Sequence, residues 1–233
     1  PTLFPYTTLF RSEGIFNAFG KERPAKDVVN IKERQVIQTG VTWDDVIGME
    51  ETKQEAREVI ELIKDRARLQ RVGGRIIKGL LLFGPPGCGK TTLARIMARE
   101  TDSFFAQFSA VLSGVKQIRS VIEAAIEQKD RLGKKTILFV DEIHRFNKAQ
   151  QDAFLHHVES GLITLIGATT ENPSFEVIPA LMSRCRVITL SALSSKEIAG
   201  ILDRAIGDEE RGFGSLDVTL APDARSHLVR IAD

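Results

Sequence analysis

The feature that most constrains this chain is a glycine-rich loop between a short apolar run and a helical pattern. Residues 84–91 read Gly-Pro-Pro-Gly-Cys-Gly-Lys-Thr and fit the pattern G-x-x-x-x-G-K-S/T. The apolar run 80–83 predicts a buried strand before the loop, and residues 92–100 predict a helix after it. Glycines let successive backbone N–H groups turn towards phosphate oxygens, and a helix N-terminus adds a positive dipole end. The sequence therefore predicts a nucleotide-phosphate site.

Every residue of this loop is expected to contribute to that site. Lys90 would reach the β- and γ-phosphates of ATP, and the Thr91 hydroxyl would bind Mg²⁺. The remaining residues would shape the loop so that its glycine backbone N–H groups surround the phosphates. The residues expected to bind nucleotide here are Gly84, Pro85, Pro86, Gly87, Cys88, Gly89, Lys90, Thr91 and Thr92.

Two carboxylates at the end of another apolar run supply the complementary chemistry. Residues 136–140 predict a buried strand, and Asp141 and Glu142 follow it directly. Two acids after a strand can also cap a helix, but beside a phosphate loop the catalytic interpretation is favoured. Asp141 would hold Mg²⁺ through its water shell, and Glu142 would orient and polarise the attacking water.

Two further positions have both a structural and a functional interpretation. Thr169 and Thr170 follow the apolar run 162–168, where a small polar group either senses the γ-phosphate or makes a turn. Arg184 follows a short predicted helix. It is either a solvated residue at the helix C-terminus or an arginine finger that contacts the ATP of a neighbouring subunit, because a planar cation suits a spread phosphoryl charge.

The alternation of apolar strands with helical patterns predicts an α/β domain, a parallel sheet covered on both faces by helices. The expected strands are 80–83, 104–108, 136–140, 163–168 and 187–190. The expected helices are 50–71, 92–100, one from about 113, 147–158, 175–182, 194–205 and one from 222.

Composition limits the partners and the environment. The chain has 233 residues and a formal net charge of +1, so any basic surface for nucleic acid must be local. Cys88 and Cys185 suggest no disulfide framework, which predicts a reducing cytosol. No apolar run approaches the roughly 18 residues of a membrane span. The histidines lack cysteine or acidic partners at metal-ligand spacing, so no histidine metal site is expected.

Three segments are expected along the chain. Residues 1–40 form an arm without periodicity, and the first twelve resemble translated sequencing-adapter sequence. Residues 41–192 form the nucleotide-binding α/β domain. Residues 193–233 form the start of a helical lid that is truncated where the sequence stops.

Residues 42–89 resemble AAA modules of the FtsH-like group of membrane-anchored bacterial metalloproteases. Trp43-Asp-Asp-Val-Ile-Gly48 and the approach Gly73-Gly74 to Gly79-Leu-Leu-Leu carry this resemblance. It implies that Ile47 and Gly48 pack against adenine. On residue type alone, Trp43 and Ile47 would equally suit a hydrophobic core.

From about residue 92 onward the chain resembles the replication-associated recombination protein A (RarA) family of AAA+ ATPases. The strings 141–154, 167–175 and 181–186 carry this resemblance, above all Asp-Glu-Ile-His-Arg-Phe-Asn-Lys. It implies a three-layer P-loop domain with strand order 5-1-4-3-2. It also makes Arg184 the finger acting on a neighbour and Thr170 the first sensor. His156 stands where the family commonly has proline, which predicts an uninterrupted helix through residue 158.

The two resemblances lead to three functional hypotheses. The first is an ATP hydrolase that uses ATP and Mg²⁺ to remodel DNA at stalled replication forks or recombination intermediates. It would be a cytoplasmic, nucleoid-associated homo-oligomer that meets DNA junctions and replication proteins but no membrane. The alternatives are the ATPase module of an FtsH-like ATP-dependent protease, and a nucleotide-gated scaffold that hydrolyses little ATP. The change of resemblance suggests a chimera joined near residues 84–91, and the chain stops before the expected lid arginine.

Overall fold

A computed structural model describes residues 41–64, 77–109, 115–209, 212–216 and 218–232. The predicted arm over residues 1–40 and the predicted helix end near residues 71–74 lie outside the described residues. Within the described part, no helix combines the length and the apolar character needed to cross a bilayer.

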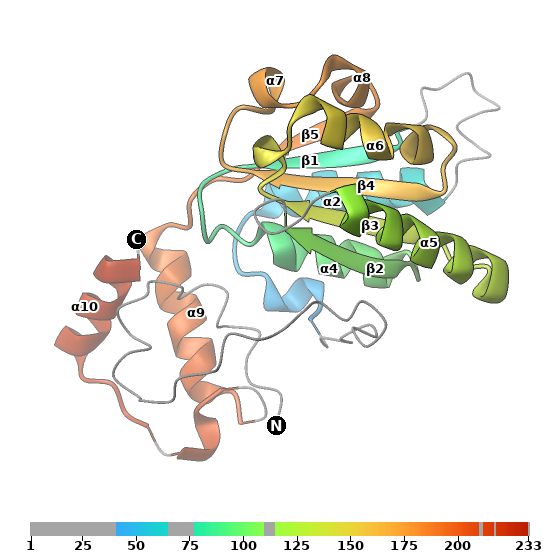
Figure 1. The fold of residues 1–233 in the computed structure, drawn as a ribbon. Helices are drawn as coiled ribbons and strands as arrows, with labels where there is room; N and C mark the ends of the chain where they lie inside the picture. Colours follow the sequence, from blue (N-terminus) through green and yellow to red (C-terminus); the bar gives the residue numbers. More distant parts are fainter. Residues whose placement is uncertain (1–40, 65–76, 110–114, 210–211, 217, 233) are drawn as a thin grey trace.

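The core of the fold is a five-stranded parallel sheet (Figure 1). Its order, β2-β3-β4-β1-β5, is the predicted order 5-1-4-3-2 read from the other edge. The strand β4 is central, buried along its whole length, and pairs with both β1 and β3. The strands are β1 (Gly79–Phe83), β2 (Phe104–Ser109), β3 (Thr136–Asp141), β4 (Ile163–Thr169) and β5 (Cys185–Thr189).

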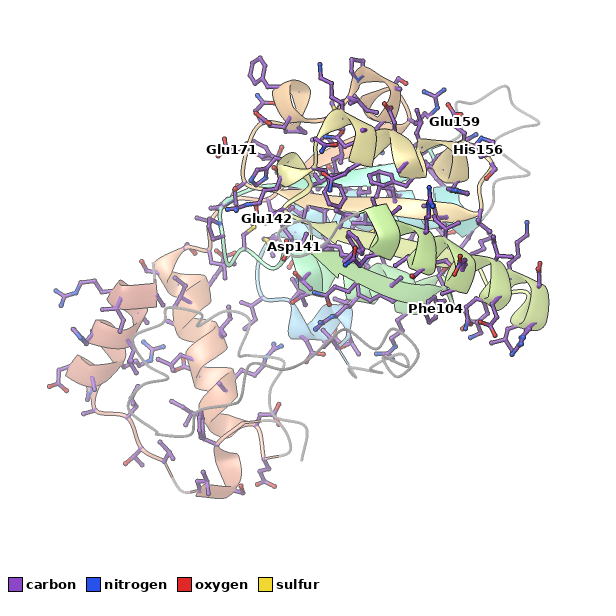
Figure 2. The ribbon with its side chains drawn as sticks, viewed as in Figure 1. Phe104, Asp141, Glu142, His156, Glu159 and Glu171 are labelled. Atoms are coloured by element: carbon purple, nitrogen blue, oxygen red, sulfur yellow. The ribbon has the colours of Figure 1, made fainter. Side chains whose placement is uncertain are left out.

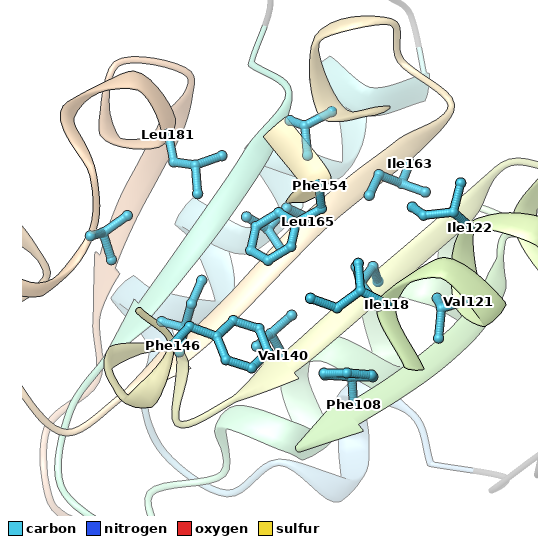
Figure 3. Packing of buried hydrophobic residues seen from close by; sticks show 14 of the residues in the cluster. Phe108, Ile118, Val121, Ile122, Val140, Phe146, Phe154, Ile163, Leu165 and Leu181 are labelled. Carbon is cyan, nitrogen blue, oxygen red and sulfur yellow. The ribbon is translucent and has the colours of Figure 1, made fainter. Parts of the chain in front are cut away.

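Helices cover both faces of the sheet, as the amphipathic patterns predict (Figure 1). On one face lie α5 (Val115–Leu132), α6 (Lys148–Glu159) and α8 (Pro179–Met182). The aromatic rings of Phe108, Phe146 and Phe154 meet under this layer, with centroids 5.7 and 6.0 Å apart (Figure 3). The other face is covered by α2 (Glu50–Lys64) and α4 (Lys90–Glu100). The three-layer α/β prediction is confirmed.

Two predicted elements have different boundaries in the structure. The predicted strand 187–190 begins earlier, at Cys185, because pairing with β1 starts there and runs to Thr189. The predicted single helix 175–182 is two short helices, α7 (Pro173–Glu176) and α8. Ile178, between them, is extended with ψ 142°, because a residue before proline avoids the helical region.

The helix α6 runs without interruption through His156, so the prediction made from that histidine is confirmed. The side chain of Asn147 caps this helix by accepting a hydrogen bond from the Gln150 N–H at 2.9 Å. His156 is exposed on the helix surface.

Beyond β5 the chain forms a smaller helical unit of α9 (Ser195–Gly207), η5 (Gly214–Leu216) and α10 (Pro222–Ala232) (Figure 1). A bidentate pair between Arg225 and Asp203, at 2.9 and 2.6 Å, joins α10 to α9. Residues 41–49, which include η3 (Trp43–Asp45), contact both this unit and the sheet domain. Arg204 donates to the Asp44 carbonyl oxygen, and Arg99 donates to the Val41 carbonyl oxygen at 3.1 Å.

Candidate functional site

The candidate site lies at the carboxyl edge of the sheet, where β1, β4 and β3 end side by side. Phe83 pairs with Thr169, and Val140 pairs with Gly167, so the residues that follow β1 and β3 flank the end of β4. Neighbouring strands are about 4.8 Å apart, which places Asp141 and the start of the phosphate loop roughly 10 Å from each other. Figure 2 shows Asp141, Glu142 and Glu171 together at this edge.

The backbone of the loop after β1 needs its glycines. A Cβ on Gly84 would lie 2.3 Å from the Leu190 carbonyl oxygen, closer than any real contact. Gly87 and Gly89 have φ of +79° and +89°, in the left-handed region that favours glycine. Gly89 is the N-cap of α4, so the positive end of this helix faces the loop. This backbone is of the kind that binds phosphate groups, and the nucleotide contacts expected from residues 84–92 stay a prediction.

Lys90 is buried at the base of the loop and faces inward. Its Nζ donates to the carbonyl oxygens of Gly84 at 2.7 Å and Pro85 at 2.6 Å, and lies 3.6 Å from Cys88 Sγ. Thr91 follows it in the first turn of α4 and is partly exposed. Burial raises the pKa of the Cys88 thiol, and the Lys90 ammonium only partly opposes this effect. Cys88 therefore stays a neutral thiol while Lys90 supplies the positive charge.

Asp141 ends β3, and Glu142 turns the chain away from the sheet into η4 (Ile143–Arg145). Glu142 has φ +54° and ψ 49°, a left-handed conformation that is unusual for a residue with a side chain. Such conformations cost on the order of 1–3 kcal/mol and cluster at functional sites. The turn leaves both carboxyl side chains partly exposed at the edge beside the phosphate loop.

A polar network joins this turn to the end of β4, and it was not found from the sequence. His144 Nδ1 lies 3.2 Å from Glu142 Oε2 and 3.0 Å from Thr169 Oγ1. Thr169 is fully buried, and its hydroxyl also donates to the Glu171 carbonyl oxygen and accepts from the Glu171 N–H. The sequence signal that could have revealed this network is the histidine two residues after Glu142.

The two threonines after β4 therefore occupy different environments. The Thr169 hydroxyl is hydrogen-bonded to His144 and Glu171, whereas Thr170 is partly exposed just beyond the strand. Of the two, Thr170 is the one whose side chain reaches solvent. Its role as first sensor stays a prediction.

Ile47 and its neighbour Val46 line a mainly apolar pocket beside the phosphate loop, whereas Gly48 is not among the lining residues. The adenine site expected at Ile47 and Gly48 stays a prediction. Ile47 lies on the α9 side of this pocket, since its side chain is 3.8 Å from a Cβ built on Gly200. Gly48 has φ +71°, and a Cβ there would lie 1.6 Å from Glu197 Oε1. The pocket is also lined by Asp45, Met49, Thr52, Cys88, Thr92 and Ile201.

Arg184 lies at the opposite edge of the sheet. Its guanidinium binds Glu159 Oε1 at 2.6 Å and the Ala180 carbonyl oxygen at 2.6 Å, and its backbone precedes β5. Figure 2 shows Glu159 and His156 at the end of the molecule away from Asp141 and Glu142. The six residues from Arg184 to the end of β5 span about 20 Å, so Arg184 is remote from its own phosphate loop.

The three histidines of the sheet domain do not form one cluster. His156 and His157 face each other on α6, with ring centroids 5.6 Å apart, while His144 lies in the network described above. Among the described residues, no three histidine, cysteine or acidic side chains are arranged to hold a metal ion.

Comparison with known proteins decides the family. The model of the ATPase family associated with various cellular activities (AAA) matches residues 80–193, which contain the whole carboxyl-edge site. The chain belongs to the AAA ATPase family. The members of this family are ATPases, and the predicted likeness to replication-associated recombination protein A is confirmed by the relatives below.

This AAA ATPase is similar to several curated proteins over part of their length. Replication-associated recombination protein A of Escherichia coli (strain K12) is 51% identical over 157 residues, 67% of this chain and 35% of the relative. The protein of the same name from Coxiella burnetii is 49% identical over 170 residues, 73% of this chain and 38% of the relative. ATPase WRNIP1 of Dictyostelium discoideum is 50% identical over 144 residues, 58% and 16% of the two chains. The chain thus spans well under half the length of these relatives.

Solved structures agree with the fold of this AAA ATPase. The Thermotoga maritima RuvB Holliday junction branch migration motor matches with a TM-score of 0.61 and 29% identity, over 82% of this chain and 61% of that one. The FIGL-1 AAA domain in complex with ADP matches with a TM-score of 0.59 and 25% identity, over 82% and 66%. The FtsH-like origin of residues 42–89 and the junction near residues 84–91 stay predictions.

Proposed function

We propose that this AAA ATPase couples ATP hydrolysis to the remodelling of DNA at stalled replication forks or recombination intermediates. The observation that carries the proposal is the carboxyl-edge site in a chain that is 51% identical to replication-associated recombination protein A over 157 aligned residues. The likeness to a Holliday junction branch migration motor supports the same class of substrate. DNA junctions, replication proteins and a place at the nucleoid are the partners and location that this proposal implies.

Each site residue has one task in the proposed reaction. Bound MgATP would supply the phosphoryl group and the metal charge, with Thr91 and Asp141 as the metal-binding side chains. Lys90 neutralises phosphate charge from the base of the loop, where it already lies against carbonyl oxygens. Glu142 orients the attacking water and takes its proton. Thr170 contacts the γ-phosphate.

Arg184 completes the site of a neighbouring subunit in this proposal. Its distance from its own phosphate loop excludes a role within one chain, whereas its side chain is 35% exposed and a second copy can reach it in competition with Glu159. In a homo-oligomer, each copy can receive Arg184 from the next copy, so the arginine reaches a phosphate loop although it is remote from its own.

The test is ATP turnover with and without forked DNA. The proposal expects turnover that rises with a fork or junction and less with linear duplex. Equal turnover with all DNA substrates would contradict DNA remodelling, and nucleotide binding with negligible turnover would favour the scaffold alternative. A rise with unfolded protein substrates instead of DNA would favour the protease-type alternative.

A further inference from the structure

We propose that His144 is a positioning residue that links the water-orienting carboxylate of Glu142 to the end of β4. The proposal deepens the proposed function and rests on it for the role of Glu142. Two contacts of one ring nitrogen carry it: His144 Nδ1 lies 3.2 Å from Glu142 Oε2 and 3.0 Å from Thr169 Oγ1. The His144 side chain is only 15% exposed, so solvent competes little for these contacts.

Hydrogen-bond counting assigns the tautomer of His144. The Thr169 hydroxyl has one hydrogen, which it donates to the Glu171 carbonyl oxygen at 3.1 Å. Its oxygen then accepts from the Glu171 N–H at 3.0 Å and has room for one more donor. An ionised Glu142 carboxylate only accepts. With the Thr169 hydrogen directed to Glu171, both groups around Nδ1 are acceptors, and the proposal assigns the His144 hydrogen to Nδ1, shared between them.

The same network reaches the phosphate loop through the backbone. The Gly84 N–H, the first of the loop, donates to the Thr169 carbonyl oxygen at 3.2 Å. Thr169 thus contacts the loop with its backbone and His144 with its side chain. The position of the acceptor at Nδ1 is therefore tied to the first residue of the loop. Glu142 lies outside regular structure, in a left-handed conformation, so its carboxylate depends on side-chain contacts for its orientation.

The first experiment measures the tautomer without any nucleotide chemistry. The chain has only four histidines, so ¹⁵N NMR of labelled imidazole gives a simple spectrum, and a His144→Asn variant assigns the signal of His144. We expect a hydrogen on Nδ1, and a changed Nδ1 signal in a Thr169→Val variant. A ring with its hydrogen on Nε2 alone would overturn the proposal, whether or not the chain hydrolyses ATP.

The second experiment separates positioning from folding. Asn places an amide where Nδ1 lies, whereas Gln places it nearer Nε2, so the two variants are matched controls. We expect His144→Ala and His144→Gln to lower kcat by roughly tenfold to a hundredfold with nucleotide affinity unchanged, the usual effect of losing an orienting partner. His144→Asn should recover most of this loss. Equal activity of the Asn and Gln variants, or a wild-type kcat in His144→Ala, would refute the link.

These outcomes also separate this proposal from the proposed function. If the unmodified chain hydrolyses ATP but ignores DNA, the proposed function fails while the kcat comparison still decides the role of His144. If the double variant His144→Ala with Thr169→Val loses no more activity than either single variant, the two residues act as one unit, as expected. Additive losses would show that His144 acts without Thr169.

Discussion

The position of Arg184 predicts that two inactive variants restore activity to each other. An arginine side chain extends roughly 7 Å from its Cα. The path along β5 from Arg184 to the phosphate loop is about 20 Å, so the guanidinium cannot contact ATP bound to its own chain. Arg184→Ala should leave nucleotide binding intact and lower turnover by about 10³-fold or more, which corresponds to about 4 kcal/mol of transition-state stabilisation.

The decisive assay mixes Arg184→Ala with Lys90→Ala. Arg184→Ala has an intact phosphate loop but lacks the arginine finger. Lys90→Ala has the arginine finger but cannot bind ATP. In a random one-to-one mixture, about a quarter of the interfaces join a sound loop to a sound finger, so turnover should rise to about that fraction of the unmodified level. Each variant alone should stay inactive.

Arg186→Ala is the matched control. Arg186 lies two residues further on and pairs with Glu58 at 3.5 Å, so the variant removes the same charge nearby without removing the finger. It should retain turnover. If Arg184→Ala hydrolyses ATP normally, or if the mixture is no more active than its components, the inference that Arg184 acts on a neighbour is wrong.

Three further predictions concern the site, the core and the helical unit after β5. Lys90→Ala should abolish tight ATP binding, whereas Glu142→Gln should bind ATP and lose hydrolysis; equal losses of affinity, measured with a fluorescent nucleotide, would contradict the division of roles. The buried hydroxyl of Thr136 has no hydrogen-bond partner in the described part of the chain, so Thr136→Val should stabilise the fold by about 1 kcal/mol in urea unfolding, and Thr136→Ser should not. The N–H and hydroxyl of Ser194 lower the pKa of Glu197 below its usual 4.5. That stabilisation is present above pH 4.5 and is lost as the pH falls through the lowered value, so Glu197→Ala should be less stable than the unmodified chain at pH 7 but equally stable in acid.

Local patterns were sufficient for most of the fold. Apolar runs of four to seven residues marked the strands, because a parallel sheet covered on both faces buries every side chain of its central strands. The β5 boundary was missed because its first residues, Cys185 and Arg186, do not extend the apolar run. The break between α7 and α8 was missed although Pro179 signalled it, because the apolar pattern continues across the proline.

The sequence by itself determined the chemistry at the site. The spacing of Gly84, Gly89 and Lys90 is typical of a phosphate loop, and Asp141 with Glu142 at a strand end is the complement that such a loop predicts. These signals are local because one turn of backbone both shapes the loop and begins the helix behind it. The resemblance added the strand order and the role of Arg184, which no local pattern contains.

Only the tertiary structure decided which residues act together. Glu142, His144 and Thr169 meet because β3 and β4 are neighbours in the sheet, although 25 residues separate His144 from Thr169 in the chain. Arg184 precedes β5, and the phosphate loop follows β1. Because these two neighbouring strands are parallel, Arg184 and the loop lie at opposite ends of the strands. Pairing across a sheet is a long-range property, and spacing along the sequence does not reveal it.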